Sequence, residues 1–296
     1  MSMVSLVRIS NDAMELAIRD SLDLIKYELP KSIRRIVIKP NMCYYWDYST
    51  GQTTDPRFVG ALINVVRRTS PDASISIVEA DASAMKCRHA FKFLGYEKLC
   101  KEHNVNLVNL SEEESDPTSV TVNGESFRMM VPRLIKDADL KINVTKIKYS
   151  LDKIKITCAL KNVFGCNPYP KKFRYHPRLS EAIVAANKAM RFDICLIDGG
   201  IVFGSQTRKL GLAMASEDSV SIDAAAAKIA GVNPSSVGYL RLAQREGLGT
   251  MSFIPRGIPI DYFKARYPKK GARATLMSKA YTLVSLMKLG KRLGLE

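Results

Sequence analysis

The sequence predicts an α/β fold in which a mostly parallel sheet is covered by helices, with a small β-hairpin insertion and a basic helical C-terminal tail. Strand-like apolar runs alternate with segments of helical spacing along most of the 296 residues, a pattern typical of parallel sheets. Hydrophobic residues make up 46% of the chain and charged residues 25%, which is typical of folded globular proteins. No uncharged apolar run is long enough for a membrane-spanning helix.

The first half of the chain supplies four predicted strands and three predicted helices. Short apolar runs predict strands at residues 4–10, 34–41, 74–81 and 105–110. Helical spacing between these runs predicts helices over residues 11–29, 56–68 and 89–103. The alternation therefore begins near the N-terminus and continues without an internal repeat.

The second half begins with a predicted hairpin. Residues 119–131 turn at Asn123-Gly124, a dipeptide preferred in two-residue hairpin loops. Further strands are predicted at 139–146, 192–200 and 211–216, and further helices at 179–190 and 218–231. We expect one α/β domain over residues 1–255 and a basic helical tail over residues 256–296.

Polar clusters follow the C-terminal ends of four predicted strands: KPN (39–41), EAD (79–81), NVTK (143–146) and IDGG (197–200). In a parallel sheet these ends meet at one rim, where open α/β sheets bind their ligands. Each cluster alone could be a helix cap or a turn, but together they predict a shared cleft. The acids nearest this rim are Glu79, Asp81, Asp198, Asp218 and Asp223. They could bind a hard cation such as Mg²⁺ or transfer protons, or could instead pair with nearby lysines or cap helices, as Asp218 at the start of a predicted helix suggests.

The chain is strongly basic, with 45 Lys and Arg against 29 Asp and Glu and a net charge of +16. Such a charge favours an anionic partner. Five lysines stand within sixteen positions: Lys146, Lys148, Lys153, Lys155 and Lys161. Alternate lysines along 146–155 could form one solvated strand face, whereas Lys161 lies within the apolar run ITCALKNVFG.

Crowded lysines repel one another, so one of them can have a lowered pKa and act as a base or form an imine. Lys161 is the catalytic candidate, together with His176 in the basic segment KKFRYHPR. The predicted ligand-binding set comprises Lys39, Asn41, Glu79, Asp81, Asn143, Lys146, Lys148, Asn162 and Asp198.

Six cysteines occur without CxxC spacing, mostly in apolar surroundings. This favours a reduced, cytoplasmic protein, and no iron–sulfur cluster or zinc site is expected. The glycines of GGIVFG (199–204) lack the spacing of a dinucleotide-binding loop, and no phosphate-binding Walker loop occurs.

Several motifs occur in a characteristic order: KPN, NVTKIK, ALKNVFG, His176, LIDGG and ASEDSVSIDAAAAKIAG. From about Val37 to Gly249 they resemble the DUF362 family, a domain of unknown function that is sometimes fused to iron–sulfur modules. The resemblance implies an α/β fold and supplies no reaction. The sequence departs from the family pattern at Tyr149-Ser150, where a histidine usually follows, and it lacks the extra cysteines of the fused form.

Two functional hypotheses follow. The first is an enzyme or sensor whose lysine-rich cleft binds, and in the enzyme case converts, an anionic small molecule that is phosphorylated or carboxylated. The alternative is a non-catalytic RNA-binding or ribonucleoprotein-associated module, with the lysines of 146–174 and the tail forming one basic stripe. The tail carries nine basic residues from Lys264 onward, so it could also contact an anionic membrane surface or dock on the sheet domain.

Overall fold

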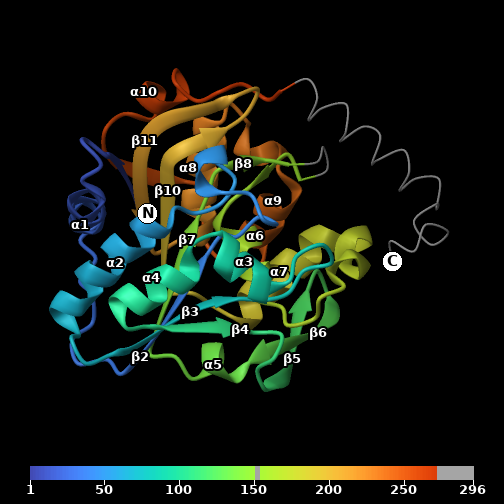
Figure 1. Ribbon diagram of the computed structural model, residues 1–296. Coiled ribbons are helices and arrows are strands. Elements are labelled where there is room, and N and C mark those ends of the chain that lie inside the picture. Colours follow the sequence, from blue (N-terminus) through green and yellow to red (C-terminus); the bar gives the residue numbers. More distant parts are fainter. Residues whose placement is uncertain (151–153, 272–296) are drawn as a thin grey trace.

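A ten-stranded mixed sheet runs through the protein in the computed structural model, which describes residues 1–150 and 154–271 (Figure 1). Its main path is, in order, β12 (Phe253–Gly257), β1 (Ser2–Arg8), β11 (Thr207–Ser216), β10 (Ile194–Phe203), β7 (Leu140–Thr145), β2 (Arg35–Pro40), β3 (Ser74–Glu79) and β4 (Asn106–Asn109). Beside this path, β8 (Lys148–Tyr149) pairs with β10 and with β9 (Ile156–Thr157).

Strands β10, β7, β2, β3 and β4 run parallel to one another, whereas β11 runs antiparallel to both β10 and β1. The α/β class and the mostly parallel sheet predicted from the sequence are therefore confirmed. The predicted hairpin is also present, as β5 (Ser115–Val122) and β6 (Glu125–Pro132). Asn123 and Gly124 both have positive φ, 54° and 79°, which the right-handed twist of a two-residue hairpin requires.

Helices cover both faces of the sheet (Figure 1). One face carries α1 (Met14–Leu24), α2 (Pro56–Thr69), α3 (Cys87–Phe93) and α4 (Tyr96–His103). The other carries α6 (Ala159–Phe164), α7 (Leu179–Ala189), α8 (Ser219–Ile229) and α9 (Gly238–Arg245). The shorter elements are α5 (Arg133–Lys136), α10 (Ile260–Lys264) and the 3-10 helices η1 (Tyr48–Thr50), η2 (Lys172–Arg178) and η3 (Pro234–Ser236).

Each central strand contributes side chains to both cores, because successive residues of a strand point to opposite faces. In β2, Ile36 and Ile38 belong to the core under α1 and α2, whereas Val37 belongs to the core under α6, α7 and α8. Because of this alternation, polar residues at the strand ends can contact one another only when they lie on the same face of the sheet. Within the described residues, no helix combines the length and hydrophobicity needed to cross a bilayer.

The folded domain continues past the expected boundary at residue 255, which falls inside β12. This strand pairs in parallel with β1, and the side chains of Phe263 and Tyr267 are buried in the core. The Tyr267 hydroxyl also donates a hydrogen bond to the carbonyl of Ile147 at 2.8 Å. Because this segment is rich in basic residues, the sequence did not predict that these two aromatic side chains would be buried. The expected tail beyond residue 271 lies outside the described residues.

Candidate functional site

A cavity of about 330 Å³ lies where the C-terminal ends of β2 and β3 meet α6 and η2. We call it the lysine pocket. Its charged and polar lining includes Lys39, Asn41, Glu79, Lys148, Lys161, Asn162, Lys172 and His176. These residues come from segments far apart in the sequence, which the parallel sheet brings to one rim.

Helix α6 positions two of these side chains, Lys161 and Asn162. A helix of six residues is not stable by itself, so its end groups need partners from elsewhere in the fold. The buried carboxylate of Asp223 accepts hydrogen bonds from the N–H groups of Ala159 and Leu160, at 2.6 and 3.3 Å. Side-chain amides bind the carbonyls of the same two residues, because Asn143 donates to Ala159 and Asn187 donates to Leu160.

Asn162 connects α6 to the floor of the lysine pocket. Its Nδ2 donates to Asn143 Oδ1 at 2.8 Å and to the carbonyl of Lys39 at 3.2 Å. Its Oδ1 accepts from Asn41 Nδ2 at 3.2 Å and from Lys39 Nζ at 3.4 Å. Both ends of the amide are therefore occupied, which fixes the orientation of Asn162 and the position of α6 over β2.

A buried ion pair completes the floor of the pocket. Lys39 Nζ lies 2.7 Å from Glu79 Oε2, and the two residues are only 1% and 4% exposed. Gly165, at the end of α6, lies beside this pair and is closest to the backbone of Asn162. A Cβ atom at Gly165 would lie 2.8 Å from the carbonyl oxygen of Asn162 and 3.6 Å from both the Glu79 carboxylate and the Lys39 side chain. The charge of Lys39 is thus already neutralised within the protein.

The other three lysines of the pocket have no carboxylate partner among the described residues. Lys148 donates to Asn41 Oδ1 at 2.7 Å and to the carbonyl of Gln52 at 3.2 Å, and Lys172 donates to the carbonyl of Gly165 at 2.8 Å. All of these acceptors are neutral. Lys161 is partly buried, and its ammonium group makes no hydrogen bond or ion pair with the described residues. Three lysines therefore face one cavity without forming an ion pair within residues 1–150 and 154–271.

Burial and mutual repulsion act on these groups together. Burial, with the charges of Lys148 and Lys172, lowers the pKa of Lys161 to about 8. Burial also lowers the pKa of Lys172, an effect that the nearby charge of Glu79 opposes and that of Lys39 reinforces. The pKa of His176 is lowered by burial and by Lys161, so its imidazole is mostly neutral at neutral pH. An anion bound in the pocket would favour the positively charged forms of these three groups and so raise their pKa values.

The pair Lys146 and Asp198 does not belong to this pocket, which corrects the expectation of one shared cleft. Lys39 is paired in register with Asn143, and Asn143 with Cys195, so these three residues share one face of the sheet. Asp198 is three positions after Cys195 and therefore points to the opposite face. There Lys146 Nζ lies 3.1 Å from Asp198 Oδ2, and both residues are 1% exposed.

Two other expected ligand-binding residues have contacts that hold the fold together. Asp81 accepts a hydrogen bond from the N–H of Cys87 at 2.8 Å at the start of α3 and pairs with Lys86 at 2.8 Å. Asn143 is fully buried beneath α6. Neither residue lines the lysine pocket.

The expected Mg²⁺ ligands do not converge. Glu79, Asp81 and Asp198 are each paired with a different lysine. Across residues 1–150 and 154–271, no three side chains of His, Cys, Asp or Glu are grouped as a metal site would require. These three carboxylates thus act as counter-ions for lysines, whereas Asp218 and Asp223 accept hydrogen bonds from the first N–H groups of α8 and α6.

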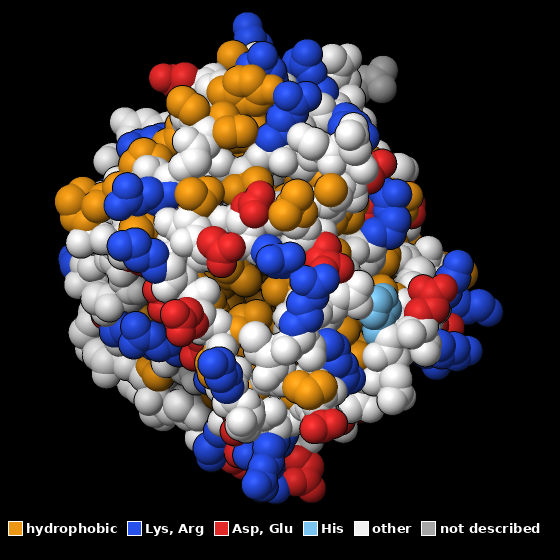
Figure 2. Space-filling model, turned by 90° about the vertical axis from the view of Figure 1, so that its left-hand side faces the viewer, with side chains coloured by type: hydrophobic (Ala, Val, Ile, Leu, Met, Phe, Trp, Pro, Cys, Tyr) orange, Lys and Arg blue, Asp and Glu red, His pale blue; other side chains and the backbone are white. Residues whose placement is uncertain are grey.

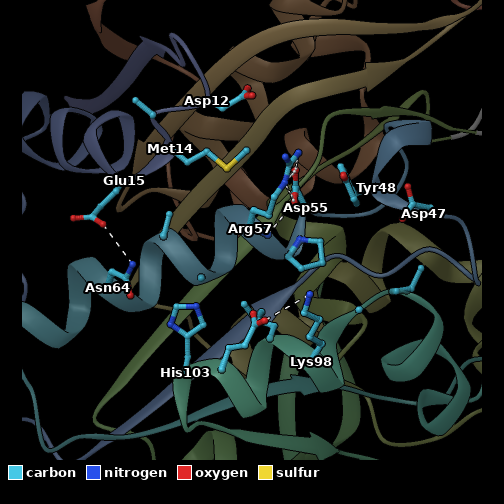
Figure 3. Close-up of a pocket in the computed structure, with 18 of the residues that line it drawn as sticks. Asp12, Met14, Glu15, Asp47, Tyr48, Asp55, Arg57, Asn64, Lys98 and His103 are labelled. Carbon is cyan, nitrogen blue, oxygen red and sulfur yellow. Dashed lines mark hydrogen bonds and ion pairs between the residues drawn. The ribbon is translucent and has the colours of Figure 1, made fainter.

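A larger groove of about 650 Å³ lies between α1, α2 and α4, and acidic residues outnumber Lys and Arg in its lining. Asp55 pairs with Arg57 at 2.7 Å, and Lys98 pairs with Glu102 at 3.7 Å. Figure 3 shows Asp55 and Arg57 side by side in this groove. Figure 2 faces the side of the molecule that carries α1 and α2, where Lys and Arg side chains are interspersed with Asp and Glu side chains. This groove therefore lacks the excess of positive charge that lines the lysine pocket.

The family model described as "Domain of unknown function (DUF362)" matches residues 36–228. The chain belongs to the DUF362 family. No curated protein matches it at a significant level of sequence similarity. Among solved structures it is similar to the lactate racemase apoprotein from Thermoanaerobacterium thermosaccharolyticum, with a TM-score of 0.45 and 12% sequence identity. That alignment covers 78% of this chain, which spans only 58% of the racemase chain.

All eight polar residues named for the lysine pocket lie within the DUF362 match. Sequence reasoning singled out seven of them and missed Lys172, which follows Asn167–Pro170 in a segment without clear periodicity. The only signal for Lys172 was the density of basic residues from Lys171 to Arg178. The position of its ammonium group depends on a hydrogen bond to the carbonyl of Gly165, and no sequence pattern predicts this contact.

Proposed function

We propose that this DUF362 protein binds an anionic small molecule, carrying a phosphate or a carboxylate, in the lysine pocket. The observation that carries the proposal is the convergence of Lys148, Lys161 and Lys172 on one cavity, where none of them has a carboxylate partner in the described part of the chain. Ammonium groups are point charges that suit phosphate and carboxylate oxygens. The bound anion would supply the missing negative charge and reduce the repulsion among the lysines.

The size of the cavity favours a small molecule. About 330 Å³ is at the lower end of the range for small-molecule sites in proteins. The RNA-binding alternative needs the lysines of 146–174 to form one continuous exposed stripe. Lys146 is buried against Asp198 on the other face of the sheet and cannot contribute to such a stripe. We therefore prefer the small-molecule hypothesis.

The pocket also holds groups that can transfer a proton. The lowered pKa of Lys161, about 8, places a substantial fraction of neutral amine within reach at mildly alkaline pH. His176 lines the same cavity. These two groups support an enzyme, whereas a sensor would need only the binding step.

Calorimetric titration with inorganic phosphate tests the proposal. Replacing Lys172 with Met removes one charged hydrogen bond to the anion, which should weaken binding by about 1.5–3 kcal/mol, or roughly 10- to 150-fold. The matched control is Lys171→Met, because Lys171 is exposed, adjacent in sequence and outside the pocket lining. Equal affinities for the two variants would contradict a defined pocket.

The same titration at several salt concentrations separates the two hypotheses. A single small anion should show a shallow dependence on salt, whereas an RNA strand that contacts many lysines should lose affinity steeply as salt rises. If a short RNA binds steeply and phosphate does not compete with it, the RNA-binding alternative is preferred.

A further inference from the structure

The amine of Lys161 differs from those of the other three lysines of the pocket in having no hydrogen-bond or ion-pair partner among the described residues. Lys39 is paired with a carboxylate, and Lys148 and Lys172 each donate to neutral oxygens. Lys161 makes no such contact with the described residues, although α6 holds its backbone through Asp223 and Asn143. The Lys161 amine therefore faces the cavity and makes no contact that stabilises the described part of the fold.

The surroundings of Lys161 favour its neutral, nucleophilic form. Lys148 on β8 and Lys172 on η2 repel its positive charge, and Cys43, after β2, is the one group that favours the charge. These influences, with burial, lower the pKa of Lys161 to about 8. A neutral amine beside fixed positive charges can attack a carbonyl carbon of a ligand whose anionic group is held by those charges.

We propose that Lys161 forms an imine with an anionic ligand that carries an aldehyde or ketone group. This inference rests on the proposed anion-binding function and narrows its substrate class to oxo acids and phosphorylated aldehydes or ketones. Lys148 and Lys172 hold the anionic group, and the Lys161 amine reaches the carbonyl.

The step is balanced without another reactant. The nitrogen lone pair of Lys161 attacks the carbonyl carbon and forms a carbinolamine. One hydrogen of the amine passes to the former carbonyl oxygen, which becomes the hydroxyl group of the carbinolamine. Loss of that hydroxyl group together with the hydrogen that remains on nitrogen yields the C=N bond and one molecule of water. His176 lines the same pocket, and its neutral imidazole can take a proton from the attacking nitrogen and return it to the departing hydroxyl.

Reductive trapping on the full chain tests this inference. Glyoxylate serves as a small oxo acid, and sodium cyanoborohydride reduces an imine to a stable secondary amine that peptide mass mapping can locate. At pH 8 we expect Lys161 to be modified at least about tenfold faster than the exposed Lys171, because a lower pKa leaves more of the amine neutral. Inorganic phosphate should slow the labelling of Lys161 and leave that of Lys171 unchanged.

Lys161→Arg keeps the positive charge but lacks the reactive amine. This variant should still bind phosphate and should lose the phosphate-sensitive labelling. If wild-type protein binds phosphate but Lys161 is labelled no faster than Lys171, the imine is overturned and anion binding stands. If phosphate neither binds nor protects Lys161, the proposed anion-binding function fails together with the inference.

Discussion

At the scale of single residues, the lysines of the pocket differ in whether a carboxylate of the described residues neutralises their charge. Lys39 is almost fully buried and paired with Glu79, so its charge is compensated within the fold. Lys161 faces the same cavity without a partner among the described residues. The difference follows from backbone position, because Lys39 extends from β2 under α6 whereas Lys161 extends from α6 itself.

Removing the counter-ion of Lys39 should be strongly destabilising. Glu79→Gln leaves a buried ammonium without a negative partner, which should lower the free energy of unfolding by about 3–5 kcal/mol. Denaturant unfolding measures this change. Glu102→Gln is the control, because its pair with Lys98 is exposed and should contribute little.

The double variant of Lys39→Met and Glu79→Gln isolates the charge effect. It should recover most of the lost stability, since no buried charge remains unpaired. If the double variant is no more stable than Glu79→Gln alone, packing rather than charge explains the loss.

At the scale of elements, α6 depends on the carboxyl group of Asp223. This side chain is fully buried and binds two N–H groups at the start of α6 and the hydroxyl of Tyr239. Burial raises its pKa from 3.8 to about 7, which outweighs the opposite effect of these hydrogen bonds. Helix α6 is thus held by a group that titrates near neutral pH.

The sign of the resulting pH dependence follows from the raised pKa. Between about pH 4 and pH 7 the folded chain retains a proton on Asp223 that the unfolded chain has lost. This group therefore stabilises the fold fully below pH 4, and the contribution is lost as the pH rises through 7. We expect the unfolding free energy of wild type to fall between pH 4 and 7.5 relative to Asp223→Asn, which has no titrating group there. Superimposable pH profiles for the two proteins would contradict this account.

At the scale of the whole molecule, the parallel sheet brings the functional residues together and also divides them. The ends of β2, β3, β7 and β10 meet at one rim, as the sequence predicted from polar clusters after apolar runs. The face on which each side chain lies depends on strand register, which those runs do not specify. For this reason Lys39 and Lys146 could not be assigned to different faces before the pairing was known.

Other features of the site could not be predicted from the sequence, because they too depend on contacts between residues far apart in the chain. Helix α6 is shorter than two full turns, so no helical period could reveal it within the apolar run ITCALKNVFG. The roles of Asn143 and Asp223 depend on contacts with that helix over 16 and 64 positions of the chain. The alternation of strands and helices is local information and was predictable, whereas these distant contacts were not.

A crystal structure of the full chain grown with tungstate, a heavy analogue of phosphate, tests the central claim most directly. Anomalous scattering locates the ion without reference to any activity. We predict one strong site in the lysine pocket, within hydrogen-bond distance of the ammonium groups of Lys148, Lys161 and Lys172. Tungstate scattered over exposed basic side chains, with the lysine pocket empty, would contradict the claim that these three lysines form an anion-binding site.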